Sequence, residues 1–258
     1  MSSDFGKLKS IMEVLTPGLV FAQDARYAKA IAATVPADVP VVMAKGSLEQ
    51  RATLNLDSLQ TTPVTPAVAQ AMGATDGHTI VKFLFTSGST KMPKAVINTQ
   101  RLWCANQQQM LQSMPILGES PLVLLDWLPW NHTFGGNQNF GLTVFNGGTL
   151  YLDHGKPTSK DMVHTIENLR EISPTAYFNV PKGFEMLVQA LENEPNLRKT
   201  FFKNLQILFY AGASMAQPIW DALERLAIET IGEKIPIITG LGCTEAGPSA
   251  MFANWGGA

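Results

Sequence analysis

The strongest constraint on the fold is a repeated alternation, from about residue 79 to residue 239, of short apolar runs with longer amphipathic stretches. Runs such as 79–85, 122–125 and 205–210 lack polar alternation, so each predicts a strand that is buried on both faces. The stretches between them carry apolar residues at helical spacing. Strands and helices in this order form mostly parallel sheets flanked by helices, an α/β fold in which ligands bind at the carboxyl ends of the strands.

The first third of the chain follows the same pattern only in part. Residues 7–44 predict a helix followed by one βαβ unit. Residues 46–77 are rich in Ser, Thr, Pro and Asn and show no clear period, which predicts a long connection or a weakly structured passage. We therefore expect residues 1–75 to form a first α/β segment with its connection, and residues 76–258 to form the larger α/β subdomain.

Composition excludes several classes of protein. The formal net charge is −2, from 19 basic and 21 acidic residues, and gives no electrostatic footprint for nucleic acid or for an anionic membrane surface. No apolar run reaches the roughly 18 residues of a membrane span, and the first residues lack the pattern of a signal peptide. Cys104 and Cys243 are far apart and predict neither a disulfide framework nor a zinc site. We expect a soluble, cytoplasmic protein.

A loop that follows the strand at 79–85 has the chemistry of a phosphate site. Glycine allows the backbone close to a ligand, successive N–H groups in a tight turn can hold an anion, and hydroxyls and lysines add donors and positive charge. The alternative is an ordinary hairpin loop, because the same residue types dominate turns. A Walker loop is excluded because the second glycine is missing. The candidate residues are Thr86, Ser87, Gly88, Ser89, Thr90, Lys91 and Lys94.

Two further stretches follow predicted strands. Residues 128–135 read Leu-Pro-Trp-Asn-His-Thr-Phe-Gly and include His132, although a lone histidine is more often a satisfied structural group. Residues 239–245 read Thr-Gly-Leu-Gly-Cys-Thr-Glu, and the Thr-Glu pair is also what an ordinary helix start would carry. Both stretches should face the same cleft. The thiol of Cys243 has apolar neighbours and no histidine nearby in sequence, which predicts an inert, buried side chain.

The turn from Tyr210 to Ala216 suggests a rival enzyme class. It ends a predicted strand, opens a helix and carries Ser214 in a near match to the Gly-x-Ser-x-Gly nucleophile elbow of serine hydrolases. That fold requires a histidine after the serine in the chain, but all four histidines precede Ser214. The serine hydrolase therefore remains a minor alternative.

Taken together, the loop at 86–94 and the stretches at 128–135 and 239–245 resemble, in order and spacing, motifs of the superfamily of AMP-forming acyl-CoA synthetases, luciferases and peptide-synthetase adenylation domains. The resemblance implies an acyl-CoA synthetase-like N-terminal domain whose first loop holds the triphosphate of ATP. The chain departs from the family pattern with Lys91 and Ala95, where glycine is usual, and with Leu241 in place of tyrosine.

The resemblance also implies roles for individual residues. His132 would gate the site and orient the carboxylate, and Phe134 and Gly135 would shape the acyl pocket. Thr244 would contact the α-phosphate and Glu245 would hold magnesium, in keeping with the way a single carboxylate and phosphates share this ion. The resemblance further places Gly212, Ala213 and Gly242 around the nucleotide.

Residues 95–100 and 129–142 look most like the feruloyl-CoA synthase branch, which activates hydroxycinnamic acids such as ferulate in phenylpropanoid catabolism. The implied enzyme is an acid-thiol ligase that uses ATP, Mg²⁺ and CoA. In the family the catalytic lysine and much of the CoA site follow the Thr-Glu motif, whereas this chain ends at residue 258, 13 positions after Glu245. We therefore expect an incomplete, poorly active fragment without the C-terminal domain, or alternatively a non-catalytic binding module that lost ATP affinity through Lys91.

Overall fold

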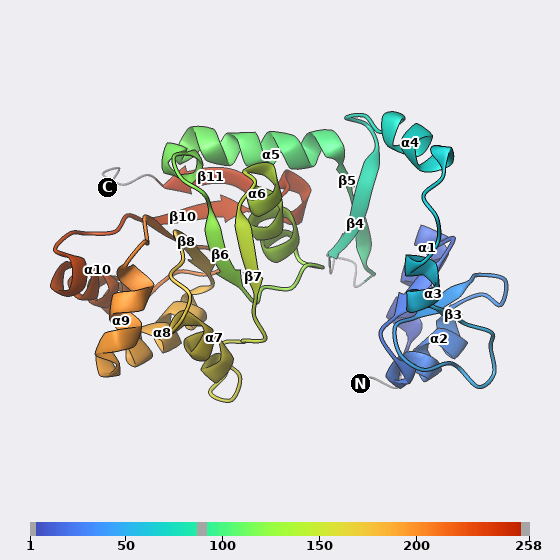
Figure 1. Ribbon diagram of the computed structural model, residues 1–258, viewed down its shortest axis with the longest axis horizontal. Helices are drawn as coiled ribbons and strands as arrows, with labels where there is room; N and C mark the ends of the chain where they lie inside the picture. Colours follow the sequence, from blue (N-terminus) through green and yellow to red (C-terminus); the bar gives the residue numbers. More distant parts are fainter. Residues whose placement is uncertain (1–3, 87–91, 254–258) are drawn as a thin grey trace. The chain divides into compact units, whose positions relative to one another are not determined.

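The computed structural model describes residues 4–86 and 92–253 (Figure 1). The chain divides into two compact units. The first contains residues 1–75 and 85–96, and the second contains residues 76–84 and 97–258. Within the described residues, no helix combines the length and the apolar character that crossing a membrane requires.

The first unit is built on a small parallel sheet with the strand order β1-β2-β3. Its central strand is buried along its whole length, which confirms the predicted βαβ unit. The side chain of Asp24 accepts a hydrogen bond from the backbone N–H of Arg26 and so starts the helical segment between the first two strands. The elements are α1 (Gly6–Leu15), β1 (Val20–Ala22), η1 (Ala25–Tyr27), α2 (Ala28–Thr34), β2 (Val41–Met43), β3 (Leu54–Asn55), α3 (Leu56–Gln60) and α4 (Pro66–Gly73).

Helices α3 and α4 lie within residues 46–77, where the sequence showed no clear period. Neither helix has a buried residue, so no apolar stripe marks them in the sequence. Their starts have local causes instead. Asn55 accepts a hydrogen bond from the N–H of Asp57, and Pro66 occupies the first turn of α4.

The hairpin of β4 (Ile80–Thr86) and β5 (Lys94–Thr99) forms a two-stranded sheet. The predicted phosphate loop joins these strands, and its residues Ser87, Gly88, Ser89, Thr90 and Lys91 lie outside the described residues.

The second unit contains a sheet of order β11-β10-β9-β8, in which β8, β9 and β10 are parallel and β11 returns antiparallel. Strands β6 and β7 form a separate parallel pair. The elements are α5 (Gln100–Ser113), η2 (Pro115–Gly118), β6 (Val123–Asp126), η3 (Phe134–Asn139), α6 (Phe140–Phe145), β7 (Thr149–Leu152), α7 (Met162–Leu169), β8 (Ala176–Asn179), α8 (Pro181–Asn193), α9 (Pro195–Phe202), β9 (Ile207–Tyr210), α10 (Gln217–Ile231), β10 (Ile237–Gly242), η4 (Thr244–Ala246) and β11 (Ser249–Ala253).

Alternate residues of the parallel strands enter two different cores. Tyr177 packs edge-to-face against Phe184 and Phe201, with ring centroids 5.6 and 5.4 Å apart, among side chains of α8, α9 and α10. Its neighbour Phe178 belongs to a second core with Phe209 and residues of α5 and β6. The predicted α/β fold, with strands buried on both faces, is confirmed.

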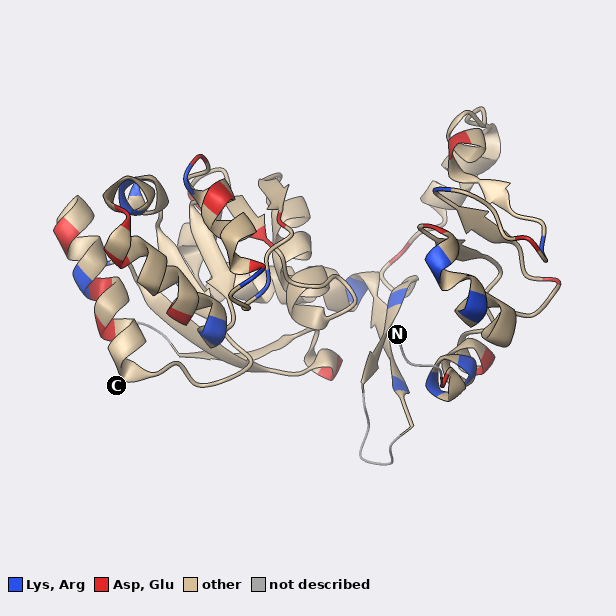
Figure 2. Ribbon diagram, turned by 90° about the horizontal axis from the view of Figure 1, so that it is seen from below, with Lys and Arg blue, Asp and Glu red and all other residues tan. Residues whose placement is uncertain are grey.

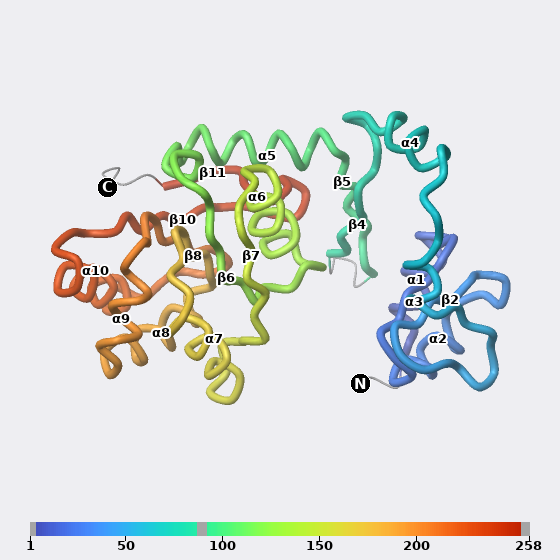
Figure 3. The backbone as a smooth tube through the Cα atoms, viewed as in Figure 1, coloured from blue at the N-terminus to red at the C-terminus, as the bar shows by residue number. Residues whose placement is uncertain are grey.

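Most charged residues of the second unit lie on helices and loops, and the four strands β8 to β11 carry none (Figure 2). Helix α5 runs along the hairpin of β10 and β11 (Figure 3), where the side chain of Asn106 donates to the carbonyl oxygen of Ser249 at 3.1 Å. This hydrogen bond ties α5 to the strand that closes the sheet. In such a sheet, functional groups are expected at the carboxyl ends of the central strands.

Candidate functional site

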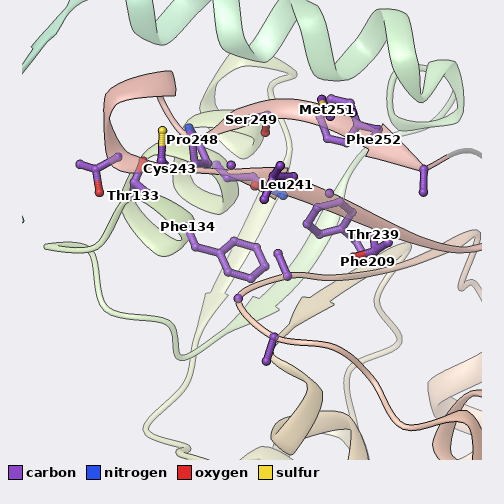
Figure 4. A pocket seen from close by; sticks show the side chains of 18 of the residues that line it. Thr133, Phe134, Phe209, Thr239, Leu241, Cys243, Pro248, Ser249, Met251 and Phe252 are labelled. Atoms are coloured by element: carbon purple, nitrogen blue, oxygen red, sulfur yellow. The ribbon is translucent and has the colours of Figure 1, made fainter.

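A pocket of about 700 Å³ lies at the carboxyl ends of β9 and β10 (Figure 4). This volume falls in the range of about 300–1,000 Å³ that is typical of small-molecule sites. Its walls come from residues 132–138, from the loop after β9, and from the β10–β11 hairpin with the turn between its strands. The position agrees with the rule that open α/β sheets bind ligands beyond the carboxyl ends of their strands.

Several residues that the sequence analysis singled out meet in this pocket, and others do not. Gly135 and Glu245 are next to lining residues in the chain but do not line the pocket themselves. Thr86 and Lys94 belong to the first unit. The predicted residues that line the pocket are His132, Phe134, Gly212, Ala213, Gly242 and Thr244, joined by Ser214.

A hydrogen bond in the loop after β6 sets the tautomer of the neutral His132 ring. The backbone N–H of Phe134 donates to Nδ1 of this exposed ring at 3.2 Å. Because Nδ1 accepts a hydrogen bond, it carries no proton, and the neutral ring bears its proton on Nε2. An Nε2–H group donates to an anionic oxygen and cannot take a proton from a hydroxyl. The geometry therefore suits orientation of a carboxylate rather than general-base catalysis.

One wall of the pocket is aromatic. Phe134 is buried and meets Phe209 edge-to-face, with ring centroids 5.9 Å apart (Figure 4). The glycine that follows holds the loop close: a Cβ on Gly135 would lie 2.6 Å from the carbonyl oxygen of Leu128. Gly135 thus shapes the pocket indirectly, by allowing the loop before it to pack on the backbone.

The segment Phe134–Asn139 is a π-helix, and all six of its residues are buried. Such wide turns are rare and occur frequently at functional sites. Three side chains from other elements hydrogen-bond its carbonyl groups. Lys82 Nζ donates to the oxygen of Gly136 at 3.0 Å, while Trp103 Nε1 and Gln107 Nε2 donate to the oxygen of Asn137 at 2.9 and 2.8 Å. The π-helix is therefore held by contacts distant in sequence.

Sequence reasoning missed the polar part of this segment. Asn137, Gln138 and Asn139 are consecutive and buried, and Gln138 lines the pocket. The available clue was the run of three amides between two phenylalanines, because buried polar groups are uncommon and require partners.

The hairpin of β10 and β11 forms the opposite wall. Gly242 is required there, because a Cβ at this position would lie 2.2 Å from the carbonyl oxygen of Pro248. Thr244 is half-buried at the start of η4, and Glu245 beside it is exposed. Cys243 is also exposed and lines the pocket, so the prediction of a buried thiol was wrong. The apolar neighbours of Cys243 in sequence did not reveal that its side chain is exposed.

The loop after β9 adds backbone rather than side chains. Gly212 has a φ of 91°, a conformation that residues with a Cβ rarely adopt. Gly212 and Ala213 have small side chains or none, so a flat group can approach the backbone of this loop closely. Ser214 lines the pocket next to them.

Two charged groups close to the π-helix have displaced pKa values. Burial lowers the pKa of Lys82, whose ammonium group also lies 4.4 Å from the ring centroid of Trp103. Burial raises the pKa of Asp126, at the carboxyl end of β6, to about 7. Hydrogen bonds from the Leu128 N–H and the Asn139 side chain offset part of this rise, and the negative charge of Asp153 adds to it.

The fold and the pocket define an α/β protein with a pocket of the size that small molecules occupy, and comparison with known families makes this specific. The family described as AMP-binding enzyme matches residues 6–257, which is nearly the whole chain. The protein therefore belongs to the AMP-binding enzyme family. The resemblance to adenylate-forming enzymes expected from the sequence is confirmed at this level.

Solved structures share the fold at low sequence identity. The anthranilate CoA ligase AuaEII in complex with anthranoyl-AMP is 17% identical, with a TM-score of 0.72 over 98% of this chain and 46% of its own. VinN in complex with L-aspartate is 19% identical, with a TM-score of 0.69 over 98% of this chain and 57% of its own. Apo MatB from Rhodopseudomonas palustris is 16% identical, with a TM-score of 0.69 over all of this chain and 46% of its own.

Among curated proteins, chalcone synthase cfoA of Aspergillus candidus is 25% identical over 173 residues, which are 67% of this chain and 6% of that protein. The chain therefore spans a small part of this relative and about half of the solved structures above.

Proposed function

We propose that the protein activates a carboxylic acid as an acyl-AMP. In this reaction a carboxylate oxygen attacks the α-phosphorus of ATP, and the bond between that phosphorus and the bridging oxygen breaks to release pyrophosphate. The observation that supports the proposal is that His132, Gly212 and Thr244, from three separate segments, line the same pocket. Such a reaction needs positioning and charge neutralisation more than a protein nucleophile.

Each wall of the pocket has a part in this proposal. His132 directs its Nε2–H at the carboxylate and holds it in line with the α-phosphorus, while Phe134 packs on the acyl group. Gly212 and Ala213 receive the adenine, and the hydroxyl of Thr244 donates to the α-phosphate. We assign the triphosphate tail to the loop at 86–94, on the chemistry of its sequence.

Magnesium would be held by Glu245 together with phosphate oxygens. The described part of the chain has no group of three or more His, Cys, Asp or Glu side chains that could hold a metal alone. An exposed carboxylate beside the proposed phosphate contact fits a cation that keeps several waters and usually shares one or two carboxylates with its substrate. The bound ion supplies charge neutralisation on the phosphates.

We further propose that the acid is a hydroxycinnamate such as ferulate, and that a longer protein transfers the acyl group to CoA. The aromatic wall of Phe134 and Phe209 supports an aromatic acid, because offset and edge-to-face ring contacts are favourable. Feruloyl-AMP should form at a low rate when the protein is incubated with ferulate, ATP and Mg²⁺, as measured by mass spectrometry, and EDTA should abolish it. Failure to form any acyl-AMP from aromatic or fatty acids would contradict the adenylation proposal.

A serine hydrolase that uses Ser214 is the second candidate, since Ser214 and His132 line the same pocket. A hydrolase histidine donates its Nδ1–H to a carboxylate and accepts the serine proton at Nε2. His132 has the opposite arrangement, with Nδ1 accepting from a backbone N–H. Labelling of Ser214 by a fluorophosphonate probe would favour this candidate. Absence of heat on calorimetric titration with ATP and magnesium would instead favour a non-catalytic binding module that lost its ATP affinity.

His132→Ala is expected to weaken ferulate binding roughly 10- to 100-fold and to leave ATP binding within twofold, because one charge-assisted hydrogen bond is worth roughly 1.5–3 kcal/mol. Isothermal titration with each ligand separates the two effects. His164→Ala is the matched control, since His164 is exposed on α7 and does not line the pocket. Equal loss of ATP and ferulate binding would show that His132 acts on the fold of the pocket instead.

A further inference from the structure

One side chain of α5 reaches the η4 turn, which carries Thr244 and Glu245. The side-chain Nδ2 of Asn106 donates to the carbonyl oxygen of Ala246, the last residue of the turn, at 3.2 Å, and to that of Ser249 in β11 at 3.1 Å. These partners lie 140 and 143 positions further along the chain. Helix α5 is drawn beside the β10–β11 hairpin in Figure 3, and Asn106 makes the hydrogen bonds between them.

The η4 turn has little support of its own. None of its three residues is buried. The N–H of Ala246 donates to the oxygen of Cys243 at 3.0 Å, a hydrogen bond that stays within the turn. Helix α5 supplies a second contact from outside, since a Cβ on Gly247 would lie 3.2 Å from Cγ of Leu102. The turn is therefore held in place largely by α5, and Asn106 provides the hydrogen bonds.

The amide of Asn106 is oriented by these carbonyl groups. Carbonyl oxygens only accept, so Nδ2 must face them, and it shares its two hydrogens with a third acceptor, Oε1 of Gln109 at 3.2 Å. The side chain exposes 4% of its surface, and its Oδ1 has no partner among the described residues. A buried acceptor without a partner costs free energy, which an apolar side chain would avoid. What the asparagine adds at this position is its donor.

The next residue on α5 is a close match to Asn106 with a different target. Gln107 exposes 2% of its surface, and its Oε1 likewise has no partner in the described part of the chain. Its Nε2 donates to the oxygen of Asn137 in the π-helix at 2.8 Å. Two neighbouring buried amides thus support opposite walls of the pocket, and neither lines it.

We propose that Asn106 is a positioning residue for ATP: by holding the η4 turn, it keeps Thr244 and Glu245 where they meet the α-phosphate and its magnesium ion. The proposal rests on the adenylation function above, which assigns these two residues to the nucleotide. Removing a support that does not touch the ligand commonly costs about 10- to 100-fold in metal affinity or activity. The π-helix has supports of its own, so the loss falls on ATP and spares the acid.

The test is isothermal titration with ATP in the presence of Mg²⁺ and, separately, with ferulate. Asn106→Leu and Asn106→Ala both remove the donor, the first filling the space of the amide and the second leaving it open. Each is expected to weaken ATP binding about tenfold and to leave ferulate binding within about twofold. The same two substitutions at Gln107 are the matched controls. They are expected to leave ATP binding unchanged, since the oxygen of Asn137 keeps its hydrogen bond from Trp103 at 2.9 Å.

The outcomes separate this inference from the proposed function. Equal losses of ATP affinity in the two Asn106 variants support it, because they share the lost donor and differ in volume; if one variant does not fold, the other decides. The inference is overturned if these variants bind ATP normally, lose ferulate affinity equally, or lose ATP affinity only when the space is left open. It is also overturned if the Gln107 variants lose as much ATP affinity. Adenylation stands in all these cases, whereas a wild type that binds no ATP contradicts both.

Discussion

Asp126→Asn is expected to make the protein more stable than the wild type at pH 8, by about 3 kcal/mol, and slightly less stable at pH 4. Asp126 exposes 4% of its surface, and one of its carboxyl oxygens, Oδ2, has no hydrogen-bond partner in the described structure. Burial raises its pKa to about 7 from an ordinary value of 3.8. A displacement of about three pH units at about 1.4 kcal/mol each corresponds to a cost of about 4 kcal/mol for the ionised form.

The sign follows from proton binding. Between pH 4 and pH 7 the folded protein keeps the proton on Asp126 and the unfolded chain has lost it, so the wild type loses stability from this group as the pH rises. Above pH 7 both states are ionised and the full cost remains. Asparagine keeps the acceptor for the Leu128 N–H, at 2.9 Å in the wild type, and carries no charge at any pH. Its new N–H₂ group takes the place of Oδ2 and finds no hydrogen-bond partner there. This unpaired donor reduces the gain in stability by about 1 kcal/mol.

Urea unfolding at intervals from pH 4 to pH 8 measures the difference between variant and wild type. Tryptophan fluorescence is a suitable probe because every tryptophan among the described residues belongs to the second unit, which contains Asp126. Asp221→Asn is the control, since Asp221 is exposed on α10 and its charge carries no such burial cost. Unfolding curves of Asp126→Asn that track the wild type at every pH would show that the carboxyl group is not held protonated.

The strands that are buried on both faces could be predicted, because such strands appear in the sequence as apolar runs without polar alternation. Strand β8 is buried at all four positions and β9 at three, and both read as apolar runs, with Asn179 as the last residue of β8. Helices α3 and α4 have no buried face, so the periodicity that identified the other helices was missing. Strand β11 was missed because its five residues include only one buried position.

The site was predictable to the extent that its chemistry lies in contiguous residues. The segments around His132, Ala213 and Thr244 could each be found from residue type and position after a strand, and the structure places all three at one pocket. The π-helix that brings Gln138 to the pocket could not, because it is stabilised by Lys82 and by residues of α5, far away in the chain. Local sequence does not record such contacts.

Gly136→Ala is expected to lower the free energy of unfolding by about 3 kcal/mol and to abolish ferulate binding under conditions where the protein remains folded. A Cβ at this position would lie 2.1 Å from the carbonyl oxygen of Trp130 and 2.9 Å from its carbonyl carbon. Both atoms belong to the backbone, so the loop must move by about 1 Å to relieve the overlap, and overpacking of this kind costs about 1–3 kcal/mol or occasionally more.

The loop that must move carries His132, the group that we propose orients the acid. The N–H of Gly136 donates to the oxygen of His132 at 2.9 Å, and the oxygen of Gly136 accepts from Lys82 at 3.0 Å, so the shift strains both hydrogen bonds. Displacing His132 by this distance removes its alignment with the carboxylate, to which rates and affinities in such sites are sensitive. Gly118→Ala is the control, because its Cβ would make an ordinary contact, 3.6 Å from a methyl group of Leu111. The opposite result would be a Gly136→Ala variant that has the same free energy of unfolding as Gly118→Ala and binds ferulate normally. That result would show that the pocket does not depend on the close packing of Gly136 against the loop.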